Sequence, residues 1–355
     1  MTEHAVKTIT RLTRAICWLA LVCLLESLAI FFYPELRTFF RRTPAEQKAT
    51  AAAVPAQASP EPSKAEQLWS APDPAGIPAG ETGELIRYGK ELIVHTAAYL
   101  GPQGSVRKIS NGMNCQNCHL GAGTKAWALN FSGVRTLYPV YKARDDRMVD
   151  AVQRVNGCFE RSMNGVPLDT ASREMKAMVA YMEWLGKDVP EGSKPAGISL
   201  KKLAYLDRAA DPEKGQAVFM TYCQSCHGAD GQGRLNDKGN EYMYPPLWGP
   251  HSYNDGAGLT RLSNFAGFVK NNMPFGTTYE HPLLSDEDAW DVAAFVDSQP
   301  RPHKDQRHDY KDLTKKPIDH PEGPYADSFS AKQHKYGPFR PIQSYYRELA
   351  AGGKP

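Results

Sequence analysis

Two short stretches combine two cysteines and a histidine at a spacing that suits one chemistry. They are residues 115–119 (CQNCH) and residues 223–227 (CQSCH). In a Cys-x-x-Cys-His run, both sulfurs can form thioether bonds to a haem, and the histidine then becomes the proximal iron ligand. The pattern therefore predicts two covalently bound haems c, held by these residues: Cys115, Cys118 and His119 for the first, and Cys223, Cys226 and His227 for the second.

Other uses of these cysteines explain less of the pattern. A four-cysteine zinc site or two structural cysteine pairs would leave His119 and His227 without a role. We therefore interpret the chain as a dihaem cytochrome.

Each haem iron also needs a sixth ligand or an open position. In the second half, Met273 precedes a proline, which favours an extended backbone suited to a loop crossing the haem face. We predict His227/Met273 ligation, which raises the reduction potential and suits electron transfer. Met243 is the competing candidate.

The corresponding residue in the first half is Cys158. Cys115 and Cys223 are 108 residues apart, and Cys158 and Met273 are 115 apart. A thiolate ligand lowers the iron potential and is also a nucleophile. Four arginines within fifteen residues of Cys158 could form an anion site: Arg144, Arg147, Arg154 and Arg161. The alternatives are an inert buried cysteine among surface arginines, and Met163 as the ligand.

Composition sets broad limits on the rest of the chain. Its 355 residues include 42 basic and 39 acidic side chains, which gives no warrant for nucleic-acid binding. Of its seven cysteines, Cys158 is the one outside both haem motifs and outside the apolar N-terminal run. An unpaired cysteine in an exported chain calls for a function.

The N-terminus has the features of an export signal. Basic residues precede an apolar run at 15–33, which is long enough to span a bilayer as a helix. We expect residues 1–34 to be a retained transmembrane anchor, and a cleaved signal peptide is the alternative. The Ala- and Pro-rich segment 35–80 then predicts a linker.

The remaining elements must position the two haem motifs. Helical periodicity is expected at 81–100, at 171–186, at 213–222 and from Ser285 to about Asp297, where Ser285 and Asp288 form a capping box. The pattern predicts an all-α fold of two tandem class-I-like cytochrome c domains with long haem-covering loops, at 81–190 and 191–300.

The segment 301–355 lacks periodicity. It could be disordered, but its aromatic residues favour a tail that wraps over both domains. We expect its four histidines at the surface: His303, His308, His320 and His334.

The whole arrangement from about residue 81 resembles the thiosulfate dehydrogenases, dihaem cytochromes c that join two thiosulfates into tetrathionate. The resemblance rests on both haem motifs, on 156–165 around Cys158, on 245–249, on 272–274, on 298–302 and on 335–339. It implies that the first haem is ligated by His119 and Cys158 and is the active site. Arg144, Arg154 and Ser162 match substrate-binding positions of the family.

One position departs from that family pattern. Some members carry Lys before the ligand Met, where this chain has Asn272. A Lys/Met ligand switch is therefore not expected, and the preferred direction, thiosulfate oxidation or tetrathionate reduction, stays open.

The resemblance also implies a location and partners. We expect a protein on the periplasmic side of the bacterial inner membrane, or a soluble periplasmic form after cleavage. An exported cytochrome c, a copper protein or a membrane oxidase would accept the electrons. Two other functions stay open, a non-catalytic membrane-tethered electron carrier and a subunit that loads sulfur onto a carrier protein.

Overall fold

The computed structural model describes Trp18 and residues 68–352. The expected anchor and most of the expected linker lie outside these residues. Within the described part of the chain, no helix has both the length and the apolar character that crossing a membrane requires. Trp69, Ala71 and Ile77, at the end of the segment predicted as linker, pack against the first hydrophobic core.

The first haem motif lies in a helical domain built on two long helices. These are α3 (Gly80–Val94) and α8 (Arg173–Leu185), which pack against each other. The helix expected at 81–100 is confirmed, with a break at His95 before α4 (Thr96–Leu100). Met175, Met178 and Met182 are buried in the core, as the periodicity predicted. The remaining elements of this part are η1 (Pro74–Gly76), η2 (Cys115–Asn117), α5 (Leu120–Gly123), α6 (Val134–Leu137), β1 (Val140–Lys142), β2 (Arg147–Val149) and α7 (Ala151–Arg161).

The second haem motif lies in a domain with the same plan. Helices α9 (Pro212–Tyr222) and α12 (Asp286–Ser298) form its main pair, and α11 (Leu262–Asn272) packs on α12. The predicted capping box at Ser285 and Asp288 is present and opens α12. The remaining elements of this part are α10 (Gln224–His227), β3 (Arg234–Leu235), β4 (Tyr242–Tyr244) and η3 (Gly258–Thr260).

A glycine at each main helix crossing shows that the two domains repeat one design. A Cβ on Gly89 would lie 1.9 Å from the carbonyl oxygen of Ala177, and a Cβ on Gly215 would lie 1.9 Å from that of Asp291. Tyr181 faces the first glycine and Phe295 faces the second. Only glycine allows the backbones to approach this closely, so any side chain here would separate the helix pair.

Among the residues that the structure describes, the fold is helical apart from two short hairpins, which the sequence did not predict. Strand β1 pairs with β2 in an antiparallel register, with Val140 opposite Val149. Strand β3 pairs with β4, with Arg234 opposite Tyr244. Each strand has only two or three residues, too few to show a period-two pattern. The first hairpin leads directly into α7, the helix that carries Cys158.

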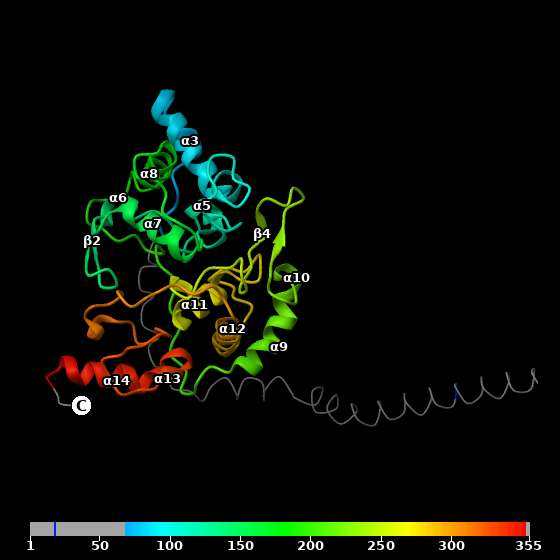
Figure 1. Ribbon diagram of the computed structural model, residues 1–355, viewed down its shortest axis with the longest axis vertical. Coiled ribbons are helices and arrows are strands. Elements are labelled where there is room, and N and C mark those ends of the chain that lie inside the picture. The colour runs from blue at the N-terminus through cyan, green and yellow to red at the C-terminus, as the bar shows by residue number, and fades with distance from the viewer. Residues whose placement is uncertain (1–17, 19–67, 353–355) are drawn as a thin grey trace, which may run out of the picture. The chain divides into compact units, whose positions relative to one another are not determined.

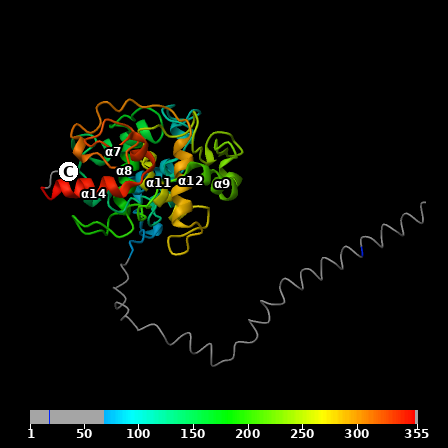
Figure 2. The same ribbon diagram turned by 90° about the horizontal axis from the view of Figure 1, so that it is seen from below.

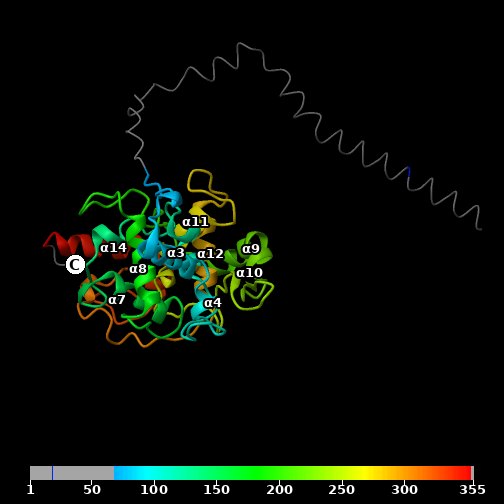
Figure 3. The ribbon, with the colours of Figure 1, turned by 90° about the horizontal axis from the view of Figure 1, so that it is seen from above.

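The C-terminal segment wraps across both domains. Figures 1 and 2 show the orange part of the chain passing beside α7 before it reaches α13 (Ala331–Tyr336) and α14 (Phe339–Ala350), with η4 (Leu313–Lys315) between. Asp309 forms a 2.7 Å ion pair with Arg161 at the end of α7. Phe339 and Ile342 are buried in the second core. Figure 3 shows the same segment from above, with α14 lying apart from α9. The tail is therefore an ordered strap, as its aromatic content favoured.

The prediction for the tail histidines is half wrong. His303 and His308 are exposed as expected, but His320 and His334 are buried. The ring of His334 bonds the carbonyl oxygen of Ile318 and the carboxylate of Asp327, so both of its nitrogens have partners. Such tertiary contacts leave no periodic signal in the sequence.

Burial of His320 predicts an acid-sensitive tail. Burial first, and then the charge of Lys316, lowers the pKa of His320 to about 4, with Arg261 lowering it and Asp319 opposing. An unfolded histidine titrates near 6.5, so the contribution to stability is complete above that pH and is lost as the pH falls toward 4. We expect the free energy of unfolding to fall by roughly 2 kcal/mol between pH 6.5 and 5 from this group.

Denaturant unfolding of the holoprotein at both pH values measures that loss. His320→Gln should lose less stability on acidification than the wild type. His308→Gln, which changes an exposed histidine of the same strap, should behave as the wild type. An equal acid response of both variants would contradict the role of His320.

Candidate functional site

The first Cys-x-x-Cys-His run lines a cavity of about 520 Å³, a size typical of a cofactor site. Cys115, Cys118 and His119 form part of its wall, together with apolar side chains such as Phe131 and Val155. The Nδ1 atom of His119 lies 2.5 Å from the carbonyl oxygen of Leu129. This contact holds Nδ1 as the donor and leaves Nε2 free to bind an iron.

Cys158 lies across the cavity from His119, within hydrogen-bond reach of its ring. It comes from α7, whose first turn is held by a capping box between Asp150 and Gln153. Met163, the competing ligand candidate, also lines the cavity but is 4% exposed and makes no such contact with His119. The arrangement brings two iron-binding side chains to face each other.

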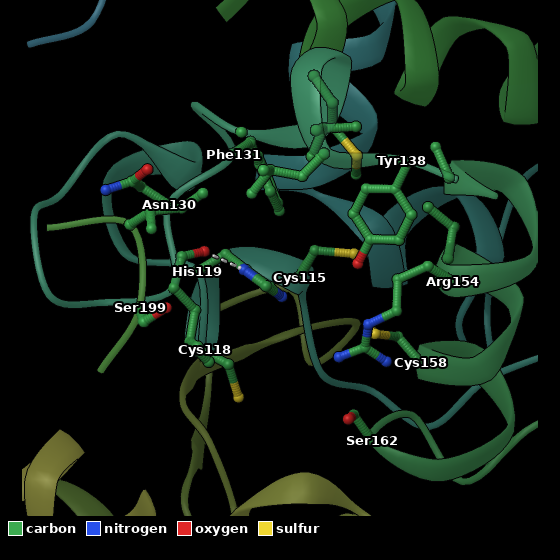
Figure 4. A pocket seen from close by; sticks show the side chains of 18 of the residues that line it. Cys115, Cys118, His119, Asn130, Phe131, Tyr138, Arg154, Cys158, Ser162 and Ser199 are labelled. Carbon is green, nitrogen blue, oxygen red and sulfur yellow. Dashed lines mark hydrogen bonds between the residues drawn. The ribbon is translucent and has the colours of Figure 1, made fainter. Parts of the chain in front are cut away.

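The surroundings of Cys158 favour the thiolate. Burial raises the pKa of Cys158, but the charge of Arg154 and the adjacent His119 ring, with a further contribution from Arg144, lower that pKa to about 6. Thiolate is the nucleophilic form of cysteine. Figure 4 shows the Arg154 guanidinium beside the Cys158 sulfur, with Tyr138 on one side and Ser162 on the other.

The predicted substrate residues are only partly brought together. Arg154 and Ser162 line the cavity with Cys158. Arg144 does not line it and lies behind Gly157, where its guanidinium is 3.7 Å from a Cβ placed on that glycine. Arg147 is exposed on β2. Arg161 is buried and directed at Asp309 and the carbonyl oxygen of Gly256, so it belongs to the strap contact rather than to an anion site.

Two lining residues were missed by the reading of the sequence. Tyr138 hydrogen-bonds Arg154, and burial raises the pKa of this phenol. Lys142 projects from β1 into the same cavity, and burial and the neighbouring arginines lower its pKa. The arginines near Cys158 indicated a functional role for the segment that forms α7. No sequence motif marks the hairpin that precedes it.

The second Cys-x-x-Cys-His run lines a separate cavity of about 570 Å³. The Nδ1 atom of His227 is 2.9 Å from the carbonyl oxygen of Pro245, which repeats the arrangement at His119. Met273 lines this cavity at the end of α11, with the extended backbone expected of a residue before proline. Met243 also lines it, but that side chain is 58% exposed.

Asn272, the residue before Met273, holds the methionine loop against the first domain. Asn272 is buried, and its amide donates to the carbonyl oxygens of Phe268 and Trp127. Trp127 belongs to the first domain, so this side chain ties the methionine loop to it. A side chain engaged in this way is not positioned to replace Met273 as a ligand.

The two cavities share part of one wall. Met113, Asn114 and Cys118 line both of them. These three residues therefore lie between the two sites.

The residues present fit two haems c. Each cavity is largely apolar, carries two cysteines for thioether bonds, and offers a histidine whose second nitrogen is already fixed by a carbonyl. Each cavity wall also carries a further sulfur that could bind an iron, from Cys158 in one cavity and from Met273 in the other.

Comparison with known families assigns the same two regions. Residues 105–190 match the model described as SoxA/TsdA, cytochrome c domain. Residues 212–300 match the cytochrome c model.

Curated relatives cover both regions together. The chain is 43% identical over 235 residues to a thiosulfate dehydrogenase of Allochromatium vinosum, which covers 65% of this chain and 83% of that protein. It is 40% identical over 235 residues to a thiosulfate dehydrogenase of Psychrobacter arcticus, covering 66% of this chain and 68% of that one. A thiosulfate dehydrogenase of Stutzerimonas stutzeri is 38% identical over 237 residues, covering 67% and 74%.

A solved structure shares the fold. It is the thiosulfate dehydrogenase (TsdBA) from Marichromatium purpuratum in its as-isolated form, with a TM-score of 0.62 and 31% identity. The match covers 75% of this chain and about half, 53%, of that chain.

Proposed function

The chain belongs to the thiosulfate dehydrogenase family, an oxidoreductase family, and carries two covalently bound c-type haems. From this premise we propose that it joins two thiosulfate ions into tetrathionate, with release of two electrons, and that the reaction is reversible. Cys158 is the reacting residue in this proposal.

The observation that carries the proposal is the position of the Cys158 sulfur. It faces His119 on one side and the Arg154 guanidinium on the other. A nucleophilic sulfur beside a fixed cation suits a substrate that combines a soft sulfur with an anionic sulfonate. Arg154 binds the sulfonate, Ser162 donates a hydrogen bond to it, and Arg144 adds positive charge from behind Gly157.

The reaction balances in two steps. First, the Cys158 thiolate and one thiosulfate form a sulfur–sulfur bond, and two electrons are removed, giving Cys–S–S–SO₃⁻. Second, the outer sulfur of another thiosulfate attacks the sulfur next to the sulfonate. The bond to Cys158 breaks, the thiolate is restored and tetrathionate leaves.

Two bound haems would supply the redox chemistry, since each can take up one electron. Met113, Asn114 and Cys118 line both cavities, so these residues would lie between the two bound haems. Cys158 would hold the first iron as a thiolate and Met273 the second as a thioether, and this ligand pair would favour transfer from the first haem to the second. An exported cytochrome c, a copper protein or a membrane oxidase then takes the electrons.

Location follows from the cofactors. Covalent haem attachment requires export, so we place the described residues in the periplasm, with residues 15–33 as the membrane anchor. If the full chain could be extracted from membranes without detergent, residues 15–33 would not be a membrane anchor.

The direct test mixes the oxidised holoprotein with thiosulfate and follows the haem absorbance. We expect rapid reduction and one tetrathionate for every two thiosulfates consumed. No reduction by thiosulfate would overturn the proposal and leave a non-catalytic electron carrier. Reduction only in the presence of a sulfur-carrier protein would instead indicate a sulfur-loading subunit.

The ligand assignment of the second haem gives a separate prediction. Met273→Ala should lower the potential of one haem by on the order of 100 mV, because a thioether ligand stabilises the ferrous iron. Electron exit should slow while the KM for thiosulfate stays the same. A potentiometric titration with optical detection measures the shift.

Met243→Ala is the matched control, since Met243 lines the same cavity. It should leave both potentials unchanged. If Met243→Ala shifted a haem potential and Met273→Ala did not, Met243 would be the ligand instead of Met273.

A further inference from the structure

A larger and more polar cavity opens beside the Cys158 site. Its volume is about 810 Å³. It shares His119, Arg154, Cys158 and Ser162 with the first haem cavity, so the two spaces are continuous around the reacting sulfur. Its wall also includes residues of the second domain, such as Tyr253 and Arg261.

The wall of this cavity carries charge of one sign. It includes five cationic side chains and no carboxylate: Lys142, Arg154, Lys194, Lys202 and Arg261. Among the residues that the structure describes, Arg261 is the one member of this set with an ion-pair partner, Asp319. Like charges repel each other, so a set of cations without carboxylates stabilises the protein poorly by itself. An anionic ligand is the ordinary reason for such a set.

The cations are arranged by depth. Arg154 lies beside Cys158, and Lys142 is half-buried on β1. Lys194 and Lys202 are exposed and come from the link between the two domains, and Arg261 immediately precedes α11 of the second domain. The outer part of the cavity is therefore formed by segments outside both Cys-x-x-Cys-His runs.

We propose that Lys194, Lys202 and Arg261 form a second anion subsite, which holds the second thiosulfate and then the distal sulfonate of tetrathionate. This inference rests on the proposed function. Two dianions must come into contact for the coupling step, and Arg154 is already engaged by the first. A second group of cations offsets their repulsion and holds the incoming sulfur near Cys158.

In this proposal, the link between the two domains contributes to substrate binding. Lys194 lies among backbone contacts that fix the link, since Trp127 and Asn130 both donate to the carbonyl oxygen of Gly197. These bonds fix the link where it forms part of the cavity wall, to which Lys194 and Lys202 belong. The second domain thus contributes to substrate binding as well as to electron exit.

The test compares two pairs of charge-removing substitutions in the holoprotein. The first pair, Lys194→Gln with Lys202→Gln, removes two lining lysines. The matched pair, Lys187→Gln with Lys201→Gln, removes the same charge from neighbouring positions outside the cavity wall. Steady-state kinetics give kcat, the KM for thiosulfate and the inhibition constant for added tetrathionate.

We expect the first pair to raise the KM and the tetrathionate inhibition constant by about 10-fold, with kcat within about twofold of the wild type. The matched pair should leave all three values near those of the wild type. Equal values for both pairs would overturn the subsite while leaving the proposed function intact. Failure of the wild type to reduce its haems with thiosulfate would instead refute the proposed function.

Discussion

Replacing Cys158 with alanine should abolish thiosulfate turnover while both haems stay attached. Loss of an attacking nucleophile costs on the order of 10⁴-fold or more in rate, because no other residue can form the covalent intermediate. The haem motifs lie elsewhere in the chain, so their thioether bonds should be unaffected. Turnover with an artificial acceptor gives the rate, and denatured-haem absorbance gives the number of haems.

The same variant should change the first haem. Its potential should rise, since an electron-rich thiolate no longer faces His119. Met163→Leu is the matched control, because Met163 lines the same cavity and the substitution nearly conserves volume. Near-normal turnover by Cys158→Ala, or its loss in Met163→Leu, would refute the assignment of the nucleophile.

Removing the Arg154 guanidinium should have the second largest effect. Arg154→Gln should lower kcat/KM for thiosulfate by about 100-fold or more, because the charge that binds the sulfonate also stabilises the Cys158 thiolate. Arg154→Lys keeps the charge but loses the planar fork, so activity should recover only in part. Steady-state kinetics with an artificial acceptor measure both variants.

Arg147→Gln controls for the general loss of positive charge in this region. Arg147 is exposed on β2 and does not line the cavity. Its loss should change kcat/KM by less than about twofold. If the two glutamine variants were equally impaired, the effect would come from the overall field rather than from contact with the substrate.

Local signals in the sequence predicted the helical framework well. The two haem motifs and the capping box at Ser285 depend on neighbours within a few residues or on a simple period. These features follow from backbone geometry that short segments specify.

Contacts between distant segments were not predictable in the same way. Arg161 was interpreted as part of an anion site because it is near Cys158 in sequence, yet on α7 its side chain is directed at Asp309 of the strap. Lys194, Lys202 and Arg261 lie 36 or more residues from Cys158 in sequence. They reach its surroundings only because the domains pack together, and a single sequence records no such packing. His320 and His334 were misplaced for the same reason.

The most direct measurement is the mass of the Cys158 peptide after the oxidised holoprotein meets a limiting amount of thiosulfate. We predict that the peptide carries an added S–SO₃ group while the haems become reduced, and that excess thiosulfate removes this group as tetrathionate appears. Tetrathionate formation with haem reduction and a Cys158 that is never modified would contradict covalent coupling at this sulfur.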